Sequence, residues 1–127
     1  MKTKYLDAKG KGIVDYDFEE DTLFFKVKNR DYLKSIDFGD FVLDVDTKGF
    51  VTGIQIFDAS KLFDVSKTTL NKVKRWQFHT KVEENKILLQ LSFEAVNKNK
   101  TVVERHSLVR DYPSSFESVA EVVCNVD

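Results

Sequence analysis

Apolar and polar residues alternate along most of the chain, which is the pattern of strands that bury one face. This period of two predicts eight strands, separated by short polar turns that are rich in Gly, Asn, Asp and Glu. The strands are expected at residues 14–18, 22–28, 33–38, 41–46, 50–57, 76–82, 87–93 and 101–112. Residues 1–12 are polar and are expected to form an arm or a poorly paired edge.

The alternation stops at residues 58–73, which lack Gly and Pro and read as a short helical segment between two β-rich halves. Asp58 is a plausible helix N-cap, because its side chain can accept hydrogen bonds from free backbone N–H groups. Ser66 is in a position to cap a second helical turn that runs through Leu70.

The C-terminal segment fits two patterns. Residues 119–123 have the composition of a strand, but Ser114 and Glu117 have the spacing of a helical capping box. The apolar residues also recur at helical spacing, at Phe116, Val119, Ala120, Val123 and Cys124. The sequence analysis therefore predicts a helix over residues 114–124.

These elements define the expected fold class, which is α+β and mainly β. We expect one domain over residues 1–127, an antiparallel meander of about eight strands with a short central helix and a C-terminal helix. Its parts are a β-meander half at 14–60, a helical connector at 61–73 and a second β half with the C-terminal helix at 74–127. The predicted core is Val14, Tyr16, Leu23, Phe25, Val27, Phe41, Leu43, Val45, Ile54, Ile56, Leu62, Trp76, Phe78, Leu89, Leu91 and Phe93.

The composition of the chain argues against several classes of function. Of the 127 residues, 42% are hydrophobic and 32% are charged, which is typical of a folded globular chain. The net charge of -1 argues against generic attraction to nucleic acid or to an anionic membrane. No apolar run has the length of a membrane span, and no signal peptide is recognisable at the N-terminus. The single cysteine, Cys124, favours a reducing cytoplasm and is expected to be a buried apolar residue.

Four residues are weak candidates for a divalent-metal site. Asp44 and Asp46 lie in an acidic strand that leads into a turn, and His79 and His106 alternate with core residues on two strands. Two histidines could meet on adjacent strands, but two ligands alone make an incomplete metal site. The alternative interpretation of all four is an ordinary polar strand face, so no metal or cofactor is predicted.

The chain contains eleven phenylalanines and no recognisable catalytic motif or glycine-rich phosphate loop. Phe24 and Phe57 fall on the opposite strand face from their core neighbours, so they are expected to be exposed and to contact a partner. An enzymatic function remains open but is not favoured. The partner expected is a protein, in the first place a second copy of the chain in a dimer.

The first half carries a recognisable pattern. Tyr16-Asp17 is followed by Asp21-x-Leu23, by Asp44-x-Asp46-x-x-Gly49 and by Gly53-Ile-x-Ile-x-x-Ala-Ser60. Over residues 14–60 this resembles the domain-of-unknown-function family twenty-two eighty-three. The resemblance implies a prokaryotic protein with a small antiparallel sheet plus a helix, and for some short members an antitoxin-like role. It supplies no catalytic residues.

The sequence thus favours a small cytoplasmic, non-enzymatic protein-interaction module, either homo-oligomeric or bound to a small partner. The alternative is a protein that binds a small ligand or a divalent metal in a cavity between the sheets. Proximity of His79 and His106, or a concave pocket, would favour the second interpretation.

Overall fold

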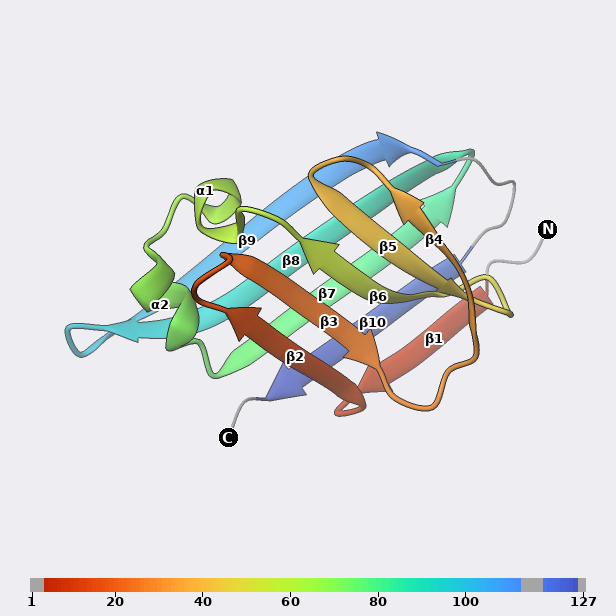
Figure 1. Cartoon of the computed structure of the whole chain (residues 1–127). Helices are drawn as coiled ribbons and strands as arrows, with labels where there is room; N and C mark the ends of the chain where they lie inside the picture. The colour runs from red at the N-terminus through yellow and green to blue at the C-terminus, as the bar shows by residue number, and fades with distance from the viewer. Residues whose placement is uncertain (1–3, 113–117, 126–127) are drawn as a thin grey trace.

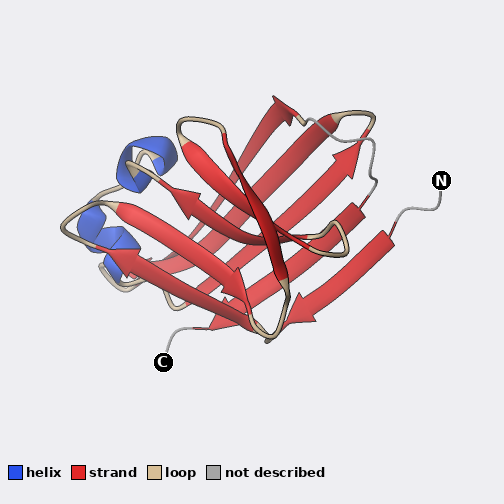
Figure 2. Ribbon diagram, turned by 45° about the vertical axis from the view of Figure 1, so that its right-hand side comes forward, coloured by secondary structure: helices blue, strands red, loops and turns tan. Residues whose placement is uncertain are grey.

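Ten strands form two five-stranded sheets that pack face to face as a sandwich (Figures 1 and 2). The computed structural model describes residues 4–112 and 118–125. Two short helices lie together at one end of the sandwich (Figure 2). The mainly β class is therefore confirmed, while the number of strands and one helix differ from the expectation.

The five predicted strands of the first half form one sheet, here called sheet B. Its order is β2-β3-β6-β5-β4, and every neighbouring pair is antiparallel. The predicted meander was therefore wrong, because β3 pairs with β6 and β4 lies at the edge of the sheet. The strands are β2 (Gly12–Asp17), β3 (Thr22–Val27), β4 (Tyr32–Asp37), β5 (Phe41–Asp46) and β6 (Val51–Ile56). A register shift after Asp44 leaves an extra residue in β6, which bends this part of the sheet.

The other layer, sheet A, has the order β1-β10-β7-β8-β9. Its strands are β1 (Lys4–Lys9), β7 (Arg75–Glu83), β8 (Lys86–Asn97), β9 (Lys100–Asp111) and β10 (Ser118–Asn125). β1 pairs with β10 in parallel, and the remaining pairs are antiparallel. The first strand of the chain thus belongs to the sheet that the second half builds.

Two expectations at the chain ends were wrong. The described part of the segment 114–124, from Ser118 on, is strand β10 and not a helix, while residues 114–117 lie outside the described residues. Residues 4–9 form strand β1 and not an unpaired arm. Both corrections have one cause: β10 lies between β1 and β7, so strand pairing satisfies its backbone on both sides. The sheet is therefore mixed and the sandwich has ten strands, not about eight.

The predicted central helix is two five-residue helices, α1 (Ala59–Phe63) and α2 (Lys67–Asn71). Ser66 caps α2 as expected, since its hydroxyl accepts from the backbone N–H of Thr69 at 3.0 Å. Asp58 was wrongly expected to cap α1. It has a left-handed backbone and its side chain makes no capping hydrogen bond, because Asp21 from sheet B takes that role.

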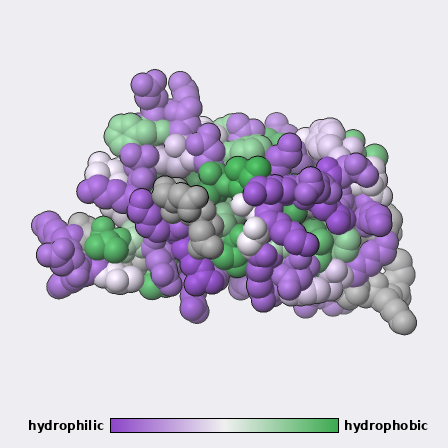
Figure 3. Space-filling view, turned by 90° about the horizontal axis from the view of Figure 1, so that it is seen from below, coloured by the Kyte–Doolittle hydropathy of each residue, from purple (hydrophilic) through white to green (hydrophobic). Residues whose placement is uncertain are grey.

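Aromatic rings fill the space between the layers. Phe25 of sheet B lies 4.5 Å from Phe78 of sheet A, centroid to centroid, and its ring also meets Trp76 edge-on. Phe63 of α1 closes the end of this cluster against Phe93. Thirteen of the sixteen predicted core residues are buried, and Val14, Tyr16 and Leu62 are partly buried against that core. The space-filling view from below shows hydrophobic side chains in the middle of a mostly hydrophilic surface (Figure 3).

Candidate functional site

The structure does not bring the two histidines together. His79 lies on β7 and His106 on β9, with β8 between them. His79 shares its register position with Gln90 and Ser107, so it projects outward, whereas His106 projects to the opposite face. There its ring packs edge-on against Phe63, with the centroids 4.8 Å apart. Among the described residues, no group of three His, Cys, Asp or Glu side chains could hold a metal ion.

The two candidate aspartates have structural partners. One oxygen of the buried Asp46 accepts a 2.8 Å hydrogen bond from Arg30 Nε and forms an ion pair with Arg30 Nη2, and its other oxygen accepts from the backbone N–H groups of Lys48 and Phe50 at 2.9 Å. These contacts hold the β5–β6 hairpin closed. Asp44 is half-buried on the outer face and accepts a 2.7 Å hydrogen bond from Ser35. Asp44 and Asp46 therefore have different hydrogen-bond partners.

The buried carboxylate of Asp21 accounts for the presence of Tyr16, Asp21 and Ser60 in the sequence pattern. Asp21 accepts hydrogen bonds from the hydroxyls of Tyr16 and Ser60, both at 2.6 Å, and from the Ser60 backbone N–H at 3.0 Å. Burial alone would raise the pKa of Asp21, but the hydrogen bonds from Ser60 and Tyr16 outweigh it and hold the pKa below its ordinary value. These three residues connect sheet B to α1, so their role is to stabilise the fold.

Phe24 and Phe57 lie on the outer face of sheet B, as their position in the alternation predicted. Phe57 is exposed as expected, with 37% of its surface accessible, whereas Phe24 is half-buried and the expectation of an exposed ring was wrong there. Phe24 pairs with Gln55, and Phe57 follows two residues later on the same side of the chain. Four aspartates share this outer face and frame the two rings on both sides: Asp15, Asp17, Asp37 and Asp44. We call these six residues the acidic aromatic face.

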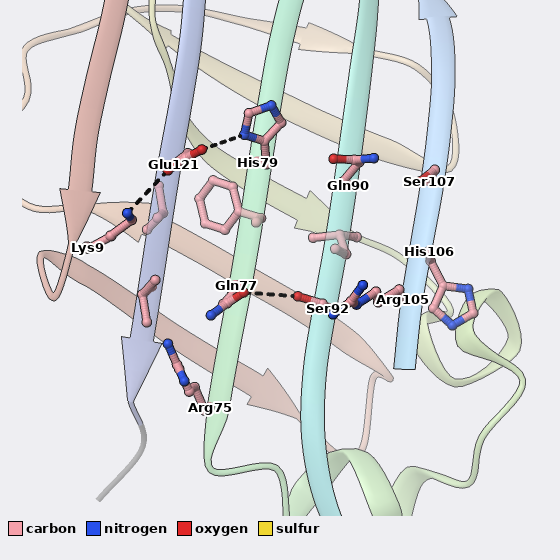
Figure 4. A pocket seen from close by; sticks show the side chains of 14 residues that line it. Lys9, Arg75, Gln77, His79, Gln90, Ser92, Arg105, His106, Ser107 and Glu121 are labelled. Atoms are coloured by element: carbon pink, nitrogen blue, oxygen red, sulfur yellow. Dashed lines mark hydrogen bonds and ion pairs between the residues drawn. The ribbon is translucent and has the colours of Figure 1, made fainter. Parts of the chain in front are cut away.

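The outer face of sheet A is hollowed into a groove of about 590 Å³ (Figure 4). The side chains come from all five strands, and those labelled in Figure 4 on the outer face are Lys9, Arg75, Gln77, His79, Gln90, Ser92, Arg105, Ser107 and Glu121. We call this the sheet A groove. It lies on the outside of the sandwich and not between the sheets, where the sequence had suggested a cavity.

Glu121 organises one end of the sheet A groove. Its carboxylate accepts a 2.9 Å hydrogen bond from Tyr5 and lies 3.5 Å from the Lys9 ammonium and 3.2 Å from His79 Nδ1. The Tyr5 hydrogen bond, with the charges of Lys9 and His79, holds the pKa of Glu121 below its ordinary value. This end of the groove is therefore locally neutralised.

Sequence reasoning missed the groove residues Gln77, Ser92 and Arg105. Alternation does place Gln77 and His79 on one face of β7, but only the strand order brings Ser92 and Arg105 beside them. A search for polar side chains at outward positions of neighbouring strands would have found them once the order was known.

Cys124 is buried, as expected, and burial raises the pKa of its thiol to about 11. At neutral pH this raised pKa keeps the thiol mainly protonated, in its less nucleophilic form. No helix in the described ranges has the length and apolar character needed to cross a membrane.

A family model described as protein of unknown function (DUF2283) matches residues 13–60, which are the strands of sheet B and the start of α1. A Methanosarcina mazei protein, named provisionally as a hypoxanthine phosphoribosyltransferase, is 35% identical over 88 residues, 69% of this chain and 72% of its own length. An uncharacterized protein of Methanocaldococcus jannaschii is 32% identical over 111 residues, 87% of this chain and 95% of its own length. No solved structure gives a significant match.

Proposed function

The chain belongs to the DUF2283 family, and we propose that it acts as a non-enzymatic protein-interaction module that binds its partner through the acidic aromatic face of sheet B. The supporting observation is the position of Phe24 and Phe57. They lie on the outer side of the sheet, in the part of the chain that the family model spans. Aromatic side chains in the middle of a polar rim are the usual anatomy of a protein interface.

The negative charge of the acidic aromatic face favours a positively charged partner. Asp15, Asp17, Asp37 and Asp44 are on the outer face, and Lys26 is the basic residue that faces out among them. Two such faces would repel each other, so a dimer through this surface alone is disfavoured. We propose a small basic protein as the partner. An antitoxin-like role, as the family resemblance implies for short members, would be one case of this function.

The transferase name of the Methanosarcina relative would give the chain a phosphorylated substrate. We favour the interaction function because the two rings lie within the residues that the family model matches. Binding of a small ligand, the alternative that the sequence left open, concerns the other sheet.

The test is affinity capture by the immobilised full chain from an extract of its source cells, with light scattering to give the native mass of the chain alone. The proposal expects a monomer that captures a basic protein, which is released by raised salt. The double variant Phe24→Ser, Phe57→Ser should lose that protein, because the rings supply the apolar contact area.

Val109→Ser is the matched control, since Val109 is exposed on sheet A and 58% of its surface is accessible. This variant should capture the same protein as the wild-type chain. Equal capture by all three chains, or capture that only the control loses, would rule out the acidic aromatic face as the interface.

A further inference from the structure

The sheet A groove contains two arginines without an acidic partner. Of the four arginines in the chain, Arg30 pairs with Asp46 and Arg110 with Asp40. The side chains of Arg75 and Arg105 make neither an ion pair nor a hydrogen bond with any described residue, and both line the groove. Glu94, which is opposite Arg75 in the strand register, does not come within ion-pair distance of it.

Polar hydrogen-bonding groups lie between the two arginines. Gln77, Ser92 and Arg105 occupy one row across β7, β8 and β9, and Arg75 precedes Gln77 by two residues on the same face. The Ser92 hydroxyl donates to the Gln77 side-chain oxygen at 3.4 Å, which leaves the Gln77 amide N–H groups free for a ligand. Figure 4 shows Gln77 and Ser92 between the Arg75 and Arg105 side chains.

The groove also has a defined charge pattern along its length. The end that holds Glu121 is neutralised by Tyr5, Lys9 and His79. The end that holds Arg75 and Arg105 also contains the outward-facing Glu94, which lines a smaller hollow together with both arginines, so an excess of one positive charge remains there. A phosphate monoester carries about -1.5 to -2 charges at neutral pH and several acceptor oxygens. Arginine side chains bind such oxygens in pairs, through N–H groups in a fixed fork.

We propose that the sheet A groove is a binding site for a small molecule that carries phosphate, with Arg75 and Arg105 as its charged contacts and Gln77 and Ser92 as neutral hydrogen-bonding groups. The volume of about 590 Å³ fits this class, because pockets for small ligands enclose about 300–1,000 Å³. The site is on the opposite layer from the acidic aromatic face and does not depend on the protein partner proposed there.

The test is titration of the full-length chain with inorganic phosphate, pyrophosphate and AMP at low ionic strength, followed by calorimetry and by amide chemical shifts. At least one probe should bind with shifts confined to β7, β8 and β9. Arg75→Gln and Arg105→Gln should each weaken that binding about tenfold or more, because each removes charge-assisted hydrogen bonds.

Lys81→Gln is the matched control. It removes one positive charge from the same sheet face, but Lys81 is paired with Glu83 at 3.0 Å and lies outside the groove. Its affinity should stay within about twofold of the wild-type value, because a paired surface charge contributes little. Arg105→Lys should bind more weakly than the wild type and more tightly than Arg105→Gln, since it keeps the charge and loses the fork.

Three results would overturn the proposal. The first is the absence of binding by all three phosphate probes. The second is an equal loss of affinity in Lys81→Gln and in the two arginine variants, which would indicate attraction to the net charge only. The third is citrate binding as tightly as the best phosphate probe, which would show a site for general polyanions. Unchanged thermal midpoints in the exposed arginine variants would confirm that each compared chain is folded.

Discussion

Asp21 and Ser60 are 39 positions apart in the chain and are joined by two hydrogen bonds to the same carboxylate. The backbone carbonyl of Asp21 also accepts from the N–H of Ala59 at 2.9 Å. One residue of the β2–β3 turn therefore provides what the start of α1 lacks, a partner for its first free N–H groups. The helix begins where the sheet supplies these acceptors.

Replacing Asp21 with Asn should lower the free energy of unfolding by about 2 kcal/mol, because hydrogen bonds to a charged group contribute about 1.5–3 kcal/mol. Asn tolerates the left-handed backbone at this position, where φ is 54°, so the loss reports the charge and not backbone strain. Asp15→Asn is the control on the exposed face and should change stability by less than about 0.5 kcal/mol. Urea unfolding of both variants measures the difference, and equal midpoints would contradict the prediction.

The same carboxylate should make stability depend on pH. The pKa of Asp21 is below its ordinary value of 3.8 in the folded chain, so folding favours the ionised form. Its contribution is complete above the unfolded pKa and is lost as the pH falls through the lower folded pKa. The stability gap between wild type and Asp21→Asn should therefore be largest near neutral pH and should shrink below about pH 4. A gap that grows on acidification would refute this assignment.

Gly12 should not tolerate a side chain. A Cβ at this position would collide with Cys124 Sγ and lie 2.6 Å from Val122 Cγ1, where β2 crosses β10. Gly12→Ala should destabilise the fold by about 1–3 kcal/mol, as overpacking of a core does. In a Cys124→Ala background the same change should cost less, because the sulfur is gone. A double-mutant cycle of unfolding free energies gives the coupling, and strict additivity would argue against the close approach.

His106 leaves one buried ring nitrogen, Nε2, without a hydrogen-bond partner. The nearest acid, Glu104, is 3.6 Å away, beyond hydrogen-bond distance. His106→Phe should therefore stabilise the chain by about 1 kcal/mol, because it removes the unsatisfied nitrogen and keeps the ring contact with Phe63. His79→Phe should give no gain, since His79 already has Glu121 as a partner. Thermal unfolding compares the two, and a lower midpoint for His106→Phe would show that Nε2 is satisfied in solution.

The Cys124 thiol should resist alkylation in the native state. Burial raises its pKa to about 11, so the reactive thiolate is scarce at pH 8 and is also shielded from the reagent. Iodoacetamide should label the folded chain much more slowly than the chain in denaturant, as followed by mass spectrometry. Comparable labelling rates in the two states would indicate that β10 opens readily at its C-terminal end.

The five strands of sheet B were predictable one by one because each shows clear alternation between polar turns, but their order was not, because β3 pairs with the distant β6 and not with β4. β10 was not predictable, because Val119, Ala120 and Val123 satisfy both a helical stripe and a strand, and only the partners β1 and β7 decide between them. The outward positions of Phe24 and Phe57 follow from local alternation. The contact between Ser92 and Arg105 does not, because it depends on which strands become neighbours.

The pairing of β1 with β10 also bears on how the chain folds during synthesis. Lys4 faces Ser118 in this register, so among the described strands β1 has no partner until β10 is made. Sheet B can form its hairpins early, but its apolar inner face stays open until β7 and its neighbours arrive. Contacts between distant residues slow folding, because the loop between them must close first. The closing step of sheet A therefore cannot come before β10 has been synthesised.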